Sequence, residues 1–280
     1  MPPTIAIIAP GAMGAGVASC LTAKGATVLT SLNGRSEGSR QRAAAAGMRH
    51  ADDAALAEAD FLLSIVPPAE AVALARRLAP ALAASSHRTV FVDCNAVSPP
   101  TAQAVADIIA ATGCDFFDAG IIGPPPKPGS TATKIYTSGE RACALGTLNG
   151  FGLIVRVLDG PLTAASALKM SYAGITKGLT AIGAAMLLAA TRGGSAEALR
   201  AELAESQPEL LRFFERMVPP MYGKAYRWGP ELDEIASFVG TERPESGMFT
   251  AAARLYEQIA ADVAGDNRET AILDQFLKPK

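Results

Sequence analysis

The stretch that decides the fold is IAIIAPGAMGAGVASCLTAKGATVLTSLNGRS, residues 5–36. It begins with a short apolar run, passes through a glycine-bearing turn into an Ala-rich helical pattern, and ends in a second apolar run. A strand, a tight turn, a helix and a second strand in this order are typical of the unit that binds dinucleotides. The turn, APGAMG at residues 9–14, lacks the first glycine of the G-x-G-x-x-G fingerprint.

The two remaining glycines of the turn are the ones that a cofactor requires most. Gly11 stands where the backbone approaches a pyrophosphate, and Gly14 stands where the helix packs close to the strand. Ala9, in the first position, is tolerable if its φ stays negative. The free N–H groups at the start of the helix would face the phosphates. We therefore expect Gly11, Ala12, Met13 and Gly14 to bind a dinucleotide; the alternative is a turn without a ligand.

The end of the second apolar run distinguishes NAD from NADP. An acidic residue there binds the ribose 2′-hydroxyl of NAD, whereas an arginine accommodates the 2′-phosphate of NADP. The chain reads NGRS at residues 33–36, and its first carboxylate is Glu37. Arg35 can pair with a phosphate, to which Asn33 and Ser36 can hydrogen-bond. We expect NADP (NADPH) as the cofactor; the alternative is that Arg35 is a solvated residue at a helix start.

Strand and helix patterns alternate through the first half of the chain. This alternation predicts an α/β fold, a Rossmann-type doubly wound parallel sheet, with its ligand crevice at the carboxyl ends of the strands. We expect strands over residues 4–9, 26–32, 61–66, 89–93, 115–118, 134–138 and 153–158, and helices over residues 14–24, 35–46, 69–82, 101–112 and 140–149.

The pattern changes after residue 161. A long helical pattern over 162–191 is ended by two glycines, and shorter helices are expected over 196–205, 208–217, 229–237 and 246–264. No strand pattern follows residue 163. We therefore expect an NADP-binding Rossmann domain over 1–161 and an all-α substrate and dimerisation domain over 162–280, joined by the long helix.

The composition limits the class of protein. Of 280 residues, 49% are apolar and 19% are charged, and the net charge is −2. These values are typical of a globular protein and exclude a basic field that would attract nucleic acid. Four cysteines without C-x-x-C spacing and two histidines predict no metal site. The chain starts without a leader pattern, and its most apolar stretch, 171–190, contains Lys177, so we expect a cytoplasmic protein without a membrane span.

Further motifs follow in order along the chain: SIVPP at residues 64–68, DCNAVSP at 93–99, the segment 118–139, and Lys169 on the first turns of the long helix. Together with the glycine turn and residues 33–36, they resemble the β-hydroxyacid dehydrogenase superfamily, which includes 3-hydroxyisobutyrate and 6-phosphogluconate dehydrogenases. The second half is most similar to the short C-terminal domain of 6-phosphogluconate dehydrogenase-like proteins of unassigned substrate.

The resemblance implies roles for residues in the first half. It places Val66 and Pro67 beside the nicotinamide end of the cofactor, and Asn95 near the nicotinamide ribose and the substrate. Relatives contact the substrate carboxylate through a Ser-Gly-Gly run, where this chain has Ile122, Gly123 and a proline. The prolines at 124–126 stiffen this loop. We expect a less polar substrate pocket on this side, formed in part by Ile122 and Gly123.

Lys169 is the expected catalytic residue. Interconverting an alcohol and a carbonyl moves a hydride, which the cofactor supplies, and a proton, which the protein must relay. Desolvation lowers the pKa of a lysine towards the neutral range, in which the side chain can both donate and accept a proton. In the resembling family an asparagine follows this lysine by four residues, where this chain has Ala173. Tyr172 shares the helix face and would substitute for it. The alternative is an exposed helix lysine.

The second half holds weaker candidates. Tyr226, Arg227 and Glu231 form a polar cluster in which Arg227 is expected to bind an acid group of the substrate; a solvated helix start explains the same residues. Gly174 and Gly178 allow two helices to approach closely, and the resemblance implies a homodimer formed by such helices.

Together these features predict an NADP-dependent oxidoreductase that interconverts a small 3-hydroxy acid and its keto form, with Lys169 as proton relay. The identity of the substrate, the physiological direction and a following decarboxylation stay open. The alternatives are an imine reductase or reductive aminase, which usually has Asp or Tyr in place of this lysine, and a catalytically idle NADP-binding protein. Activity on cyclic imines would indicate the first, and a closed pocket beside Lys169 the second.

Overall fold

The computed structural model describes residues 2–278. The chain divides into two compact units, Met1–Met170 and Ser171–Lys280, and each is considered by itself. The division falls inside the long helix α6 (Ala164–Arg192) and later than the boundary at 161 expected from the sequence. The first turns of this helix are therefore part of the first unit.

The first unit is built on an eight-stranded sheet with the order β3-β2-β1-β4-β5-β6-β7-β8. Its strands are β1 (Thr4–Ile8), β2 (Thr27–Thr30), β3 (Arg49–His50), β4 (Phe61–Ser64), β5 (Val90–Asp93), β6 (Phe116–Ile122), β7 (Lys134–Ser138) and β8 (Val155–Val157). Its helices are α1 (Ala12–Thr22), α2 (Glu37–Ala45), α3 (Asp53–Leu56), η1 (Pro68–Glu70), α4 (Ala71–Ala84), α5 (Pro99–Ala110) and the 3₁₀ helix η2 (Ala142–Phe151).

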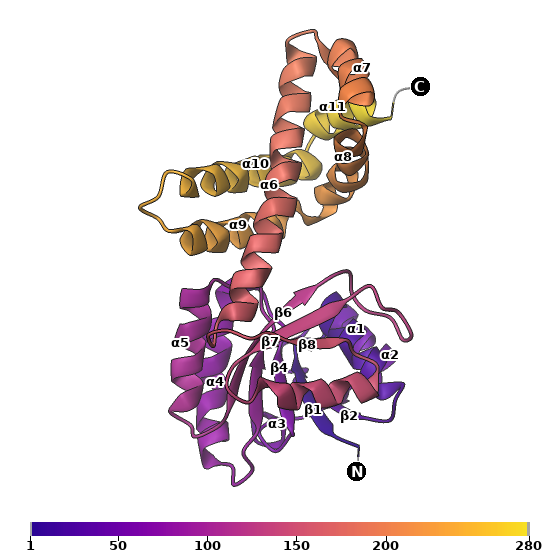
Figure 1. Ribbon diagram of the computed structural model, residues 1–280. Helices are drawn as coiled ribbons and strands as arrows, with labels where there is room; N and C mark the ends of the chain where they lie inside the picture. Colours follow the sequence, from indigo (N-terminus) through magenta and orange to yellow (C-terminus); the bar gives the residue numbers. More distant parts are fainter. Residues whose placement is uncertain (1, 279–280) are drawn as a thin grey trace. The chain divides into compact units, whose positions relative to one another are not determined.

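Both faces of this sheet are covered. Along β1, Ile5 and Ile7 belong to one buried cluster, with α1, α2 and η2, whereas Ala6 and Ile8 belong to the other, with α3, α4 and α5. Figure 1 shows α4 and α5 on one side of the strands and α1 and α2 on the other. A strand that is buried on both faces reads as an unbroken apolar run, which is why the first strand was visible in the sequence.

The predicted doubly wound α/β fold is confirmed, with one difference in strand direction. Strand β7 runs antiparallel to β6, while the other neighbouring pairs are parallel. Residues 123–133 connect β6 and β7 without a crossover helix, and an antiparallel neighbour needs none. Strand β3 and helix α3 were not predicted, because both are too short to show a period. The helix expected over residues 140–149 is the 3₁₀ helix η2.

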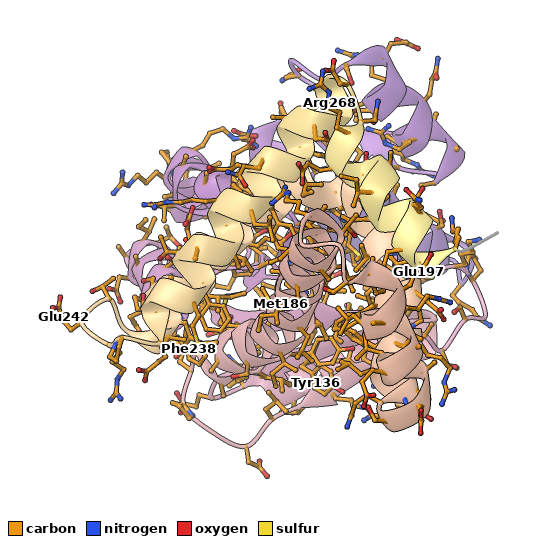
Figure 2. All side chains as sticks on the ribbon, turned by 90° about the horizontal axis from the view of Figure 1, so that it is seen from above. Tyr136, Met186, Glu197, Phe238, Glu242 and Arg268 are labelled. Carbon is orange, nitrogen blue, oxygen red and sulfur yellow. The ribbon has the colours of Figure 1, made fainter. Side chains whose placement is uncertain are left out.

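The second unit is helical throughout its described residues, as expected. It contains most of α6, followed by α7 (Ala196–Ser206), α8 (Pro208–Met221), η3 (Tyr222–Lys224), α9 (Ala225–Val239), α10 (Ser246–Ala264) and α11 (Arg268–Leu277), the last of which was not predicted. Helices α9 and α10 lie side by side. Figure 2 shows Glu242 at the tip of their connection and Arg268 where α10 gives way to α11.

A buried ion pair joins α6 to α9 within this unit. The Lys177 ammonium donates to Glu231 and lies 5.3 Å from the ring centroid of Trp228. The Tyr256 hydroxyl donates to the Lys177 carbonyl at 2.6 Å. Burial lowers the pKa of Lys177, and the Glu231 carboxylate opposes that shift. The pair thus fixes one face of α6 against its neighbours.

Within residues 2–278, α6 is the one helix whose length and hydropathy would suffice to cross a membrane. Half of its most apolar window is buried inside the protein. The core helix of a globular protein passes the same test, so length and hydropathy give only weak evidence here.

Candidate cofactor and active site

The glycine turn after β1 has the geometry of a phosphate-binding turn. A Cβ atom on Gly14 would lie 2.1 Å from the Ala9 carbonyl oxygen, so only glycine lets α1 approach the strand this closely. A Cβ on Gly11 would meet no atom within 4 Å, and no side chain caps the first N–H groups of α1. Ala9 does not adopt a positive φ. The turn therefore leaves an open approach to the helix N-terminus, which fits a pyrophosphate.

The loop after β2 is held from two sides. The Leu32 N–H donates to Nδ1 of His50 at 3.2 Å, so the end of β3 positions the start of the loop. Ser36 caps α2, and its hydroxyl accepts from the Ser39 N–H. Asn33 is exposed and Arg35 is partly exposed. The residues predicted to select the cofactor thus lie at the carboxyl end of β2, next to the strand that precedes the glycine turn.

Asn95 is buried and acts on the backbone of a neighbouring turn. Its Oδ1 accepts from the Val66 N–H at 2.7 Å, and its Nδ2 donates to the Ser64 hydroxyl at 2.8 Å. Its own N–H donates to Asp93 at 2.9 Å. The amide therefore sets the path of the chain that enters Pro67. Direct contact of Asn95 with a cofactor or substrate stays a prediction.

The start of α6 is bound to the sheet by a pair of facing residues on β6 and β7. Asp118 and Ser138 are paired across these strands. Asp118 accepts from the Ser166 N–H at 2.7 Å and from its hydroxyl at 2.6 Å, and the Ser138 hydroxyl accepts from the Ala165 N–H at 2.9 Å. Two side chains from the sheet thereby satisfy N–H groups that the first turn of a helix leaves without intrahelical partners.

The same contact places Lys169. A Cβ atom on Gly120 would lie 3.0 Å from both the Ala165 carbonyl oxygen and the Lys169 Cβ, so the helix crosses β6 at van der Waals distance. One residue further along β6, the Ile121 carbonyl accepts from Lys169 Nζ at 2.8 Å. Lys169 is partly buried. Its ammonium thus lies at the carboxyl end of the strand, at the edge of the sheet that carries the glycine turn.

Burial controls the protonation of two groups beneath this helix start. It raises the pKa of Asp118 to about 6, although the hydrogen bonds from Ser166 oppose that shift. It also raises the pKa of the Cys94 thiol, and the nearby carboxylates of Asp93 and Asp118 add to this effect. Cys94 therefore stays a thiol at neutral pH and is not a nucleophile.

The loop that replaces the Ser-Gly-Gly run rests on α1. Pro126 is buried, and its carbonyl oxygen lies 2.8 Å from where a Cβ on Gly16 would be. The Thr133 hydroxyl donates to the Pro124 carbonyl. Prolines have no N–H to donate, so residues 124–126 offer only carbonyls and apolar rings. Ile122 is partly exposed and Gly123 is exposed at the start of this loop.

Residues 4–144, about half of the chain, match the NAD binding domain of 6-phosphogluconate dehydrogenase. The chain belongs to the β-hydroxyacid dehydrogenase superfamily. Its first unit therefore carries the nicotinamide-cofactor domain of a β-hydroxyacid-type dehydrogenase. Residues 190–259 match a domain of unknown function. The family predicted from the motifs is thus confirmed.

Several solved structures resemble this dehydrogenase over nearly its full length. A conserved protein of unknown function, reported as similar to 3-hydroxyacid dehydrogenases, is 26% identical, with 93% of this chain and 98% of that chain covered and a TM-score of 0.71. The 3-hydroxyisobutyrate dehydrogenase of Mycobacterium tuberculosis shares the fold at 21% identity, 98% and 99% coverage and a TM-score of 0.70. An imine reductase from Myxococcus stipitatus, in complex with NADP⁺, shares it at 18% identity, 99% and 100% coverage and a TM-score of 0.56.

The predicted site residues of the dehydrogenase separate into two groups. The glycine turn, the loop after β2, the Asn95 network, Ile122, Gly123 and Lys169 all belong to the first unit. Tyr172 and Arg227 belong to the second unit, where both are exposed. Their expected contact with a substrate stays a prediction.

The residues that hold the start of α6 and the loops after β1 and β2 in place were not predicted from the sequence. Asp118, Ser138 and Ser166 bind the start of α6, yet Asp118 and Ser166 are 48 positions apart, so no local pattern connects them. His50 and Arg42, which contact the cofactor loops, were also missed. Arg42 and Ser39 are three positions apart on a helix, and that spacing was the one available signal.

Proposed function

We propose that the protein is an NADP-dependent oxidoreductase that interconverts a small 3-hydroxy acid and its keto form. The observation that carries the proposal is the placement of Lys169 Nζ, 2.8 Å from the Ile121 carbonyl, at the sheet edge that also bears the glycine turn. A bound nicotinamide supplies or accepts the hydride. The chain must then bind the cofactor and move one proton at the substrate oxygen.

Each predicted residue has one task in this scheme. Gly11 and Gly14 admit the pyrophosphate to the N-terminus of α1, and Arg35 pairs with the 2′-phosphate. Asn95 fixes the Val66 backbone, which the resemblance places beside the nicotinamide. Lys169 donates its proton to the substrate oxygen in the reducing direction and accepts one in the oxidising direction. Decarboxylation would follow only if the keto product is a β-keto acid.

Substitution of the lysine tests the scheme. In Lys169→Met we expect turnover to fall by about 10²-fold or more, the range of a general acid–base, with NADPH affinity within about twofold of wild type. Turnover with a panel of 3-hydroxy acids and fluorescence titration with NADPH measure the two effects. Lys24→Met, an exposed lysine at the end of α1, is the matched control. Near-normal turnover in Lys169→Met would contradict the role.

A second candidate function is reduction of an imine. The prolines at 124–126 supply no N–H donors for a carboxylate, and this observation favours a less acidic substrate. A panel of cyclic imines, compared with 3-hydroxy acids under NADP(H), separates the two functions. Turnover of imines alone would replace the first proposal.

We also propose a homodimer formed through α6, in the cytoplasm. Five side chains at spacings of three and four, between 38% and 65% exposed, form an apolar stripe on α6: Tyr172, Ile175, Leu179, Ile182 and Met186. At on the order of 100 Å² for each side chain, two stripes would bury about 1,000 Å², near the lower limit of a specific interface. A two-fold interface uses the same patch on both copies, so this single stripe on each α6 would suffice.

Light scattering after gel filtration tests the dimer. Wild type is expected to run as a dimer at micromolar concentration, and Ile182→Glu as a monomer, because each copy would then place a carboxylate inside the apolar interface. Ala201→Glu, on the exposed surface of α7, is the matched control. A monomeric wild type, or a dimeric Ile182→Glu, would contradict the stripe as the interface.

A further inference from the structure

We propose that Arg42 is a second residue that binds the 2′-phosphate of NADP, beside Arg35, and that it sets the preference for NADP over NAD. The inference rests on the proposed cofactor. Arg42 lies in the last turn of α2, outside the Asn33–Ser36 stretch in which the selecting residues were sought. Its side chain nevertheless reaches back to the cofactor loops.

Two hydrogen bonds hold the guanidinium between two turns. Arg42 Nε donates to the Pro10 carbonyl at 3.3 Å, and Nη2 donates to the Ser39 hydroxyl at 2.9 Å. Pro10 belongs to the glycine turn that follows β1, and Ser39 lies in the first turn of α2, just after the loop that follows β2. Because β1 and β2 are paired neighbours, the two turns flank the same crevice at the sheet edge. A ribose held there presents its 2′ position to the end of β2.

The charge of Arg42 is available to a ligand. A guanidinium has five N–H donors in a fixed plane, and two of them make the bonds described above. Among residues 2–278 no carboxylate forms an ion pair with Arg42, and its side chain is exposed. The Ser39 and Ser36 hydroxyls, 3.2 Å apart, lie beside it as further hydrogen-bonding groups. A phosphate dianion suits this combination of a fixed cation and hydroxyls.

Arg40 provides a contrast on the same helix. Its Nε donates to the Arg35 carbonyl at 3.2 Å, so its contact is with the backbone of the loop. Two positions along a helix correspond to about 200° of rotation, so Arg40 and Arg42 leave the helix on different sides. Because Arg40 supports the loop that carries Arg35, the control of the same charge is Arg76, an exposed arginine on α4, which covers the other face of the sheet.

Binding measurements with wild type, Arg42→Gln and Arg76→Gln test the inference. Titrations use NADPH, NADH, adenosine 2′,5′-bisphosphate and AMP, so that each pair differs by the 2′-phosphate. A lost charge-assisted bond is worth about tenfold or more in affinity. In Arg42→Gln we expect the dissociation constants of NADPH and the bisphosphate to rise at least about tenfold, with those of NADH and AMP within about twofold. Arg76→Gln should leave all four within about twofold.

The outcomes separate the inference from the proposed function. An unchanged NADPH affinity in Arg42→Gln, or equal losses for NADPH and NADH, overturns the inference, because the bonds to Pro10 and Ser39 would then have only a structural role. In either case a wild type that prefers NADPH leaves the proposed cofactor in place. A wild type that binds NADPH and NADH equally overturns both. Arg42→Lys should retain more of the NADPH affinity than Arg42→Gln, since it keeps the charge.

Discussion

Replacement of Asp118 by asparagine should change how the stability of the protein depends on pH. The folded protein raises the pKa of this carboxyl from 3.8 to about 6, chiefly because the group is buried. The native state therefore holds a proton more tightly than the unfolded state does. The stabilisation from that proton is complete below about pH 4 and is lost as the pH rises through about 6.

The size of this effect follows from the shift. A shift of about two pKa units corresponds to about 3 kcal/mol of unfolding free energy. Asp118→Asn cannot ionise, yet it keeps an acceptor for the Ser166 N–H and gains a donor for the Ser166 hydroxyl. The free-energy cost of replacing the protonated carboxyl by the amide is the same at every pH. Because the unfolded carboxyl is already partly ionised at pH 4, the stability of the variant relative to wild type should increase by about 2 to 2.5 kcal/mol between pH 4 and pH 7.

Urea unfolding of both proteins at half-unit steps from pH 4 to pH 7.5 measures the difference. Asp115→Asn is the control, because this residue directly precedes β6 and its carboxylate is exposed and pairs with Arg141. A difference between wild type and Asp118→Asn that stays constant over this range would refute the reasoning. So would a difference that moves in the opposite direction.

Two further predictions concern the glycine turn and the second unit. Gly14→Ala should destabilise the first unit, because its Cβ would lie 2.1 Å from the Ala9 carbonyl oxygen. Gly11→Ala should keep the thermal unfolding temperature of wild type but bind NADPH more weakly, because its Cβ would enter the open approach to the helix. Calorimetry measures the stability and titration measures the affinity, and equal stability of the two variants would contradict the geometry. Glu231→Gln should cost about 3–5 kcal/mol in urea unfolding, because it leaves the buried Lys177 ammonium without its counter-charge. Asp233→Asn, exposed on the same helix, is its control, and a loss under about 1 kcal/mol would contradict the role of the pair.

The elements with a strong local period could be predicted from the sequence. Strand β7 and helix α10 have the residues expected for them, because an apolar strand or a long amphipathic helix shows its period within one segment. Strand β3 could not be predicted, because its two residues, Arg49 and His50, show no apolar pattern. They form a strand only through their pairing with β2. The antiparallel direction of β7 likewise depends on its pairing with β6.

The residues of the candidate site also differ in whether a local sequence pattern could identify them. The glycine turn and Lys169 were visible because a motif or a family register singles them out. The bonds of Asp118 to Ser166, and of Arg42 to Pro10, join residues distant in the chain. Asn95 was expected beside the cofactor, which stays a prediction, whereas its bond to the Val66 N–H, 29 positions away, was not predicted. Local sequence patterns do not report such long-range bonds.

The division of the chain into two compact units falls at Met170, inside α6. Lys169, its bond to Ile121 and the Asp118 contact with Ser166 all fall on the sheet side of that division. An exchange of the helical unit between residues 170 and 171 would therefore leave Lys169 in the first unit, bonded to its strand. A chimaera that carries a different helical unit, joined at this position, is thus expected to keep the bond of Lys169 to Ile121 and the bonds of Asp118 to Ser166.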